Sequence, residues 1–208
     1  MNAELGETVA VRRRAGRRIE FLSIAWTSLE AIIGIVAGLL AGSVALIGFG
    51  IDSIIEVASS GVLLWRLSDQ PHAEEREEVA HRLVGVGFFA LAAYIAVAAL
   101  HDLLTHQPPR VSHFGIVYAA VCIIIMPLLA HAKRRAAAKL DSDALHADSH
   151  QSDLCAYLSA ILLVGLALNA LFGWWWADPV AALCMLPIIT KEGFAGLRGE
   201  SCSHHHGT

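Results

Sequence analysis

Two acidic residues, Asp52 and Glu56, lie four residues apart in a stretch made mostly of aliphatic and small residues. On a helix, this spacing puts both carboxylates on one face. Two such groups repel each other unless they share a cation or a proton, and a divalent metal ion can be that shared partner. The alternative is a carboxylate pair that only forms hydrogen bonds inside a helix bundle. We favour the metal-binding interpretation.

A second polar stripe lies between residues 145 and 172, and its side chains supply carboxylate, amide and thiol groups. Members on one helical face are Asp148, Gln151, Ser152, Cys155 and Ser159, and Asn169 returns to nearly the same face further along. Leucines 154 and 158 take the other side. A single cysteine in a helix is usually a packing residue, but two polar stripes together favour a site between them. The predicted metal ligands are Asp52, Glu56, Asp148, Gln151 and Cys155, with Ser152 and Asn169 as accessory residues.

Glu30 adds a further intramembrane carboxylate. Gly34, Gly38 and Gly42 follow it at four-residue steps. Such a ridge of small residues permits close contact between helices, so we expect Glu30 to face protein rather than lipid. We also expect the ridge to pack against the second apolar run of the same chain rather than between subunits. Glu30 is then either an accessory carboxylate beside the metal site or a structural hydrogen-bonding residue.

Six apolar runs must position these residues, and all but the short sixth run approach the length needed to cross a hydrocarbon core of about 30 Å. They cover residues 21–41, 43–64, 83–103, 114–130, 145–172 and 179–189 with some extension. The chain of 208 residues is 56% hydrophobic and only 16% charged, which is typical of membrane proteins rather than of soluble domains. The prediction is an all-α, polytopic membrane protein with six transmembrane helices.

Turn residues agree with this division. Gly42 and Ser43 form a hairpin, with Ser43 as the N-cap of the second span. Asp178 precedes a proline and is predicted to be the N-cap of the sixth span. Pro187 lies within the sixth span, and a proline can end or kink a helix, so the sequence does not fix the residue at which this span ends.

The basic residues indicate the orientation. Of the 15 Lys and Arg residues, Arg110 alone falls on one side of the predicted bilayer, so both termini are predicted to be cytoplasmic.

The basic connection at residues 133–139 is interpreted as a solvated linker. Asp153, which lies off the polar stripe, is interpreted as a partner for a basic residue. Residues 1–20 form a basic cytoplasmic segment, 21–198 the transmembrane domain and 199–208 a tail whose Cys202 and histidines either bind metal or form a disordered end. The expected location is the plasma or inner membrane, as a multi-pass protein.

Three motifs resemble those of the cation diffusion facilitator superfamily. They are the Asp-x-x-x-Glu pair at residues 52–56, Ala-Asp-x-x-Gln-x-x-x-Cys at 147–155 and Ala-Asp-Pro at 177–179. Gln151 and Cys155 stand where the family carries histidine and aspartate. The resemblance implies a six-helix transporter that exchanges zinc or similar ions for protons. It also implies a short-form branch that lacks the family's C-terminal cytoplasmic domain.

The predicted function is therefore efflux of a divalent metal cation by alternating access, coupled to protons, and no enzyme activity or resident cofactor is expected. Zinc is the first choice of cargo. Cd, Co, Fe, Mn and Ni remain open, because Cys155 favours softer ions and the oxygen ligands favour harder ones. The main alternative is a non-transporting membrane metal sensor or modulatory subunit, and transport of another cation is a second one. Predicted partners are the metal ion, protons and the lipid bilayer, with a homodimer through the membrane helices left open and no nucleic acid.

Overall fold

The computed structural model describes residues 2–66, 73–140 and 143–198. Within these ranges the chain forms helices and no strand. The helices are α1 (Asn2–Ala41), α2 (Val44–Arg66), α3 (Ala73–Thr105), α4 (His113–Leu140), α5 (Asp143–Phe172) and α6 (Ala177–Arg198). All six are long and apolar enough to cross a membrane. The prediction of an all-α protein with six membrane-spanning helices is confirmed, and its orientation stays a prediction.

Large apolar side chains cover the outside of the bundle. Leu40, Val97 and Leu171, for example, are each more than 70% exposed. Exposed apolar surface on this scale is unfavourable in water, whereas in a bilayer it faces lipid chains. The polar residues lie inside instead, and α2 is the most enclosed of the six helices.

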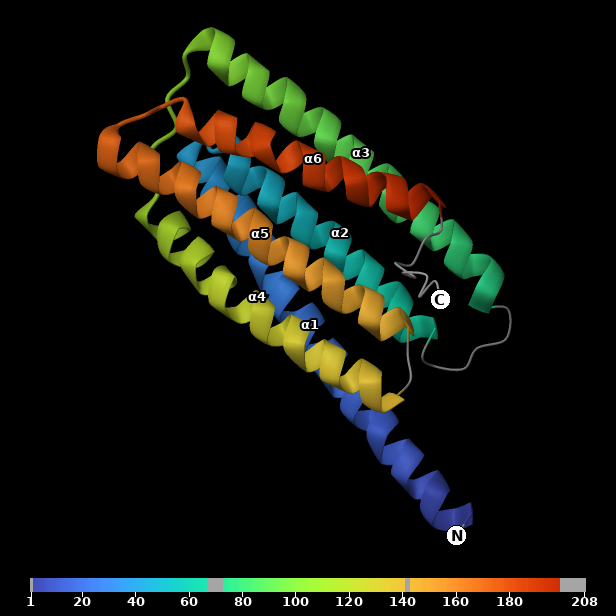
Figure 1. Cartoon of the computed structure of the whole chain (residues 1–208). Helices are drawn as coiled ribbons and strands as arrows, with labels where there is room; N and C mark the ends of the chain where they lie inside the picture. The colour runs from blue at the N-terminus through green and yellow to red at the C-terminus, as the bar shows by residue number, and fades with distance from the viewer. Residues whose placement is uncertain (1, 67–72, 141–142, 199–208) are drawn as a thin grey trace, which may run out of the picture.

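The helices pack so that α2 and α5 contact each other within the bundle (Figure 1). The α1 helix packs against α2 and α4, and α4 packs along most of α5. The remaining two helices, α3 and α6, pair with each other and lie together along one side of the molecule (Figure 1). Of the two helices that carry the polar stripes, α2 is thus surrounded by α1, α3, α5 and α6, and α5 packs against α2, α4 and α6.

Glycines bring α1 and α2 into close contact. A Cβ atom added at Gly34 would lie 2.9 Å from Cα of Gly50, and one at Gly38 would lie 2.6 Å from a side-chain carbon of Ile47. Gly42 does not pack in this way; it adopts a φ of +66° in the turn between the helices. The prediction that this ridge packs within the chain against the second span is confirmed for Gly34 and Gly38.

The N-terminus of α2 has two caps, one of them predicted. The Ser43 hydroxyl accepts a hydrogen bond from the backbone N–H of Leu46 at 3.1 Å, which confirms Ser43 as the N-cap. The prediction that Asp178 caps its own helix is wrong. Its carboxylate accepts a hydrogen bond from the Ser43 hydroxyl at 2.5 Å and a longer one, 3.4 Å, from the backbone N–H of Ala45. Asp178 therefore stabilises the start of α2 from the first turn of α6.

Two helices extend further than the apolar runs indicate. The α4 helix continues to Leu140, so residues 133–139 are helical and the interpretation of this segment as a linker is wrong. The α6 helix continues through Pro187 to Arg198. We call the end of the bundle where α4 ends, α5 begins and α6 ends the basic end. The sequence predicts that it faces the cytoplasm.

Candidate metal site

A small cavity lies between α2, α3, α5 and α6. Its volume is about 10 Å³, which is the space of roughly one water molecule. Polar groups reach it from three helices, and the other lining residues are apolar. The lining residues are Asp52, Phe88, Gln151, Leu154, Cys155, Leu158, Ile188, Ile189 and Glu192. Asp52 and Cys155 are both buried, with 7% and 2% exposure.

The polar stripes of α2 and α5 face each other in antiparallel register. Asp52 and Cys155 share the cavity. One turn closer to the basic end, the Ser152 hydroxyl lies 3.4 Å from Oε1 of Glu56. The stripes therefore meet as predicted, although α5 also contributes Leu154 to the cavity, a residue that was placed on the opposite face.

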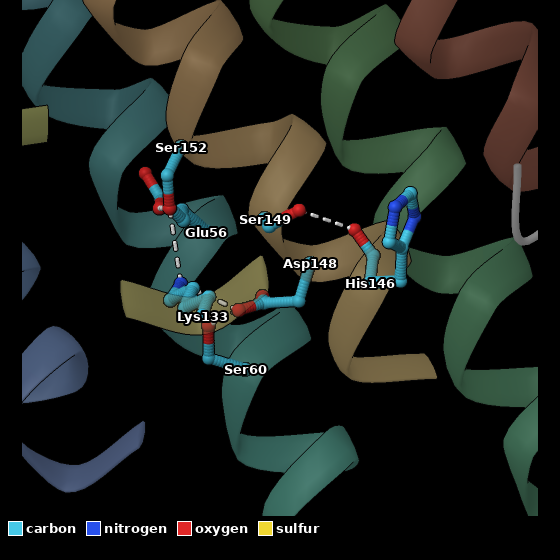
Figure 2. A network of polar contacts seen from close by, with 7 residues as sticks. All are labelled: Glu56, Ser60, Lys133, His146, Asp148, Ser149 and Ser152. Carbon is cyan, nitrogen blue, oxygen red and sulfur yellow. Dashed lines mark hydrogen bonds and ion pairs between the residues drawn. The ribbon is translucent and has the colours of Figure 1, made fainter. Parts of the chain in front are cut away.

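A further turn toward the basic end, the stripes join a charged network (Figure 2). The Ser60 hydroxyl donates a hydrogen bond to Asp148 at 3.2 Å. The Lys133 ammonium, from α4, lies 2.5 Å from the other oxygen of Asp148 and donates a hydrogen bond to the Ser152 hydroxyl at 3.0 Å. Lys133 also acts electrostatically on Glu56. A buried charge of this kind is stable only when it is paired and hydrogen-bonded, and Lys133 meets both conditions.

The predicted ligands thus divide into two groups along the bundle. Asp52, Gln151 and Cys155 line the cavity, whereas Glu56 and Asp148 belong to the network around Lys133. Which of the five bind metal stays a prediction.

The three predicted accessory residues, Ser152, Glu30 and Asn169, lie in different parts of the bundle. Ser152 connects Lys133 with Glu56. Glu30 is buried and accepts a hydrogen bond from the indole N–H of Trp26 at 2.8 Å, while its second oxygen has no hydrogen-bond partner within the described structure. Asn169 lies away from the cavity and donates a hydrogen bond to the backbone oxygen of Pro109 at 3.2 Å.

Asp153 was expected to pair with a basic residue, and this is confirmed. It forms an ion pair with Arg134 at 2.5 Å, with the two side chains 30% and 36% exposed. Adjacent basic residues of α4 therefore have different roles, because Arg134 pairs near the surface while Lys133 is fully buried.

Three charged residues near the site were missed from the sequence. Glu192 lines the cavity, but it lies beyond Ile189, where the sixth apolar run was ended. Glu20 is fully buried, but it was counted with the basic N-terminal segment. Lys133 was counted with a linker. The sequence could have indicated Lys133 through the helical register of α4. If the helix is continued through the basic run, one residue of that run faces the inside of the bundle.

Oxygen and sulfur ligands of this kind suit divalent transition metals. In the described part of the chain, no three Asp, Glu, His or Cys side chains converge closely enough to hold an ion as they stand.

A match to a known domain decides the family. Residues 21–199 match the cation efflux transmembrane domain. The chain belongs to the cation efflux family. The resemblance seen in the three sequence motifs is confirmed by this match, which covers all of α2 to α6 and most of the buried part of α1.

Curated relatives agree with the assignment. Transmembrane protein 163 of Xenopus laevis is 32% identical over 142 residues, which is 67% of this chain and 50% of that protein. The uncharacterized transporter sll1263 of Synechocystis is 31% identical, over 69% of this chain and 49% of its own length. The cation-efflux pump FieF of Citrobacter koseri is 29% identical, over 81% of this chain and 60% of its own length. The chain spans about half the length of the first two relatives.

Proposed function

We propose that this chain transports a divalent metal cation out of the cytoplasm, with zinc or a related transition metal as the cargo. The observation that carries the proposal is the cavity that Asp52 of α2 lines together with Gln151 and Cys155 of α5. These residues supply a charged oxygen, a neutral oxygen and a sulfur from two helices that face each other. The membership of the chain in the cation efflux family supports the same function.

The electrostatics of the cavity favour a cation. Three other carboxylates, those of Glu30, Glu56 and Glu192, lie close enough to Asp52 to act on it electrostatically. Carboxylates crowded together in a medium of low dielectric repel each other and are costly to keep charged. A divalent ion removes this repulsion and supplies the bonds that water would otherwise make. A neutral solute would leave it in place.

Proton coupling follows from the same crowding. When the ion leaves, the carboxylates lose their counter-charge, and protons from the side to which the ion was released can replace it. The return of the empty carrier would then move protons in the opposite direction to the metal. Alternating access needs the site to open to one side at a time, and the arrangement of α3 and α6 as a pair beside α2 and α5 provides two groups that can move against each other (Figure 1).

The proposed orientation places the basic end in the cytoplasm, in the plasma or inner membrane. Glu192 then lies on the cytoplasmic side of the cavity, since α6 runs from Ala177 toward the basic end. Glu192 is only partly buried, so it is a suitable first contact for a cation that arrives from that side.

A flux assay on the purified protein in sealed liposomes tests the proposal. Zn²⁺ or Mn²⁺ is added outside, a metal-sensitive dye reports its arrival inside, and a pH-sensitive dye reports proton movement in parallel. We expect metal uptake that is accompanied by proton release and that is lost in Asp52→Asn. The matched control is Arg134→Met, which removes a surface ion pair and should leave flux unchanged.

Binding without flux in the wild-type protein would refute transport and would support the metal sensor or modulatory subunit instead. Flux without proton movement would refute the coupling and leave efflux standing.

A further inference from the structure

The network around Lys133 includes a carboxylate that has no hydrogen-bond partner among the described residues. Glu20 of α1 is fully buried, and neither of its side-chain oxygens has a hydrogen-bond partner in the described structure. It acts electrostatically with Asp148, Lys133 and Glu56, so it faces the same network. A buried carboxylate without hydrogen bonds is destabilising when it is charged, and a bound cation would remove this cost.

Four helices contribute to this cluster, which we call the Lys133 cluster. It consists of Glu20 from α1, Glu56 and Ser60 from α2, Lys133 from α4, and Asp148 and Ser152 from α5. One oxygen of Glu56 is buried without a hydrogen-bond partner among the described residues, as are both oxygens of Glu20. The cluster therefore contains buried carboxylate oxygens that accept no hydrogen bond, and the Lys133 ammonium is the positive charge that acts on them.

We propose that the Lys133 cluster is a second binding site for a divalent cation, in which the Lys133 ammonium holds the place of the ion when no ion is bound. The inference rests on the proposed function, because it takes the bound cation to be the cargo of the transporter. Arrival of the ion displaces the ammonium from Asp148, and departure of the ion lets it return.

The formal charges support this role. Three carboxylates, of Glu20, Glu56 and Asp148, act on one ammonium. When all three are ionised they carry three negative charges, of which the ammonium offsets one. A divalent cation in its place offsets two. The donors are carboxylate and hydroxyl oxygens, which favour harder ions such as Mn²⁺ over soft ones.

Lys133 is suited to act as a tethered cation. Its ammonium is a compact charge on a flexible stem, so it can leave Asp148 without movement of the α4 backbone. In the described structure no three Asp, Glu, His or Cys side chains converge closely enough to hold an ion, so the carboxylates of the cluster must close in on the ion once the ammonium leaves. Lys133 thereby competes with the cargo.

The position of the cluster gives it a place in transport. Ser60 lies eight residues from Asp52 along α2, which corresponds to about 12 Å toward the basic end. Glu56 lies between the two levels, close enough to Asp52 and to Lys133 to act on both. An ion in the cluster is therefore next to the cavity and can pass to it by way of Glu56.

Binding of Mn²⁺ to the purified full chain tests the second site without need of transport. Equilibrium dialysis combined with the electron paramagnetic resonance signal of Mn²⁺ counts the ions bound. The Asp52→Asn variant should have no flux but should still bind one Mn²⁺, and Asp52→Asn with Glu20→Gln should bind none. The matched control is Asp52→Asn with Glu30→Gln, which neutralises another buried carboxylate of α1 outside the cluster and should keep the ion.

Glu20→Gln removes an unpaired buried charge, so it is expected to fold at least as well as the parent chain. If Asp52→Asn binds no Mn²⁺, or if the ion persists after Glu20→Gln, the second site is refuted. Loss of the ion in the Glu30→Gln control as well would also refute it, because binding would then not depend on the cluster. The proposed function fails by a different result, the absence of flux in the wild-type protein.

The role of Lys133 is tested by removing its charge in the Asp52→Asn background. We expect Lys133→Met to lower the dissociation constant for Mn²⁺ by roughly tenfold, within the usual range of coupling between competing ligands. Arg134→Met removes the neighbouring positive charge and should leave the constant unchanged. Equal affinities for the Lys133→Met variant and its parent would refute the competition. If Lys133→Met does not fold, the same competition is tested with Lys133→Arg, whose larger guanidinium forms two bonds to a carboxylate and should weaken Mn²⁺ binding.

Discussion

The substitution Gly34→Ala adds a single methyl group where α1 meets α2. Its Cβ would lie 2.9 Å from Cα and 3.1 Å from the backbone nitrogen of Gly50. Both are backbone atoms and cannot rotate away, so the two helices must separate. Overpacking of this size costs about 1–3 kcal/mol, and alanine regains up to about 1 kcal/mol through its helix propensity. We expect a net loss of about 1–2 kcal/mol in the free energy of unfolding.

Thermal unfolding in one detergent, followed by tryptophan fluorescence, measures this loss. For a chain of this size, about 1–2 kcal/mol corresponds to a fall of roughly 3–6 °C in Tm. The matched control is Gly61→Ala in α2, where an added Cβ meets nothing within 4 Å. That variant should keep or raise the Tm, because alanine is the better helix former.

The two variants together can refute the argument. A Tm for Gly34→Ala equal to that of the wild type would show that α1 and α2 are not in close backbone contact. Chemical cross-linking in the same detergent adds a second criterion. If Gly34→Ala yields a stable, active monomer and loses a dimer that the wild type forms, the ridge is an intersubunit surface.

Further substitutions test the site and its support. Asp52→Asn should abolish metal flux while leaving the Tm within about 1 °C or raising it, since it removes a buried charge but keeps the shape; near-normal flux in liposomes would contradict the assignment. Cys155→Ser keeps the volume but removes the soft ligand, so flux of Cd²⁺ and Zn²⁺ should fall more than flux of Mn²⁺. An equal effect on all three ions would make Cys155 a packing residue. Glu192→Gln should raise the KM for metal more than it lowers the maximal rate, and an unchanged KM would remove Glu192 from the path. Asp178→Ala should lower the stability by about 1–2 kcal/mol through loss of the cap on α2, and an unchanged Tm in detergent would show that the bond to Ser43 contributes little.

The periodicity of the sequence was enough to predict the six spans and the meeting of two polar stripes. Apolar runs of membrane length are strong local signals, and the four-residue step from Asp52 to Glu56 determines a shared face without any tertiary information. The glycine ridge after Glu30 likewise predicted a close contact between α1 and α2, because small residues at this spacing let two helix backbones approach each other in a membrane.

The tertiary partners were not predictable in the same way. Asp178 bonds to Ser43, which is 135 residues away, and a local pattern assigns it to its own helix because Asp before Pro is a common helix start. Lys133 lies in a run of basic residues that normally marks the end of a span. Its burial depends on α4 continuing as a helix past the apolar run and on the carboxylates that α1, α2 and α5 bring to it.

The bond between Asp178 and Ser43 joins the first turns of α6 and α2 at the end of the bundle opposite the basic end. A link at this point would act as a hinge, so that the two helices would spread apart at their far ends. Asp52 lies about 14 Å and Glu192 about 21 Å along its own helix from this hinge, and a small tilt of α6 therefore moves Glu192 further than it moves any residue beside Asp178. The cavity between Asp52 and Glu192 would then widen toward the basic end as a wedge, while the opposite end stays closed.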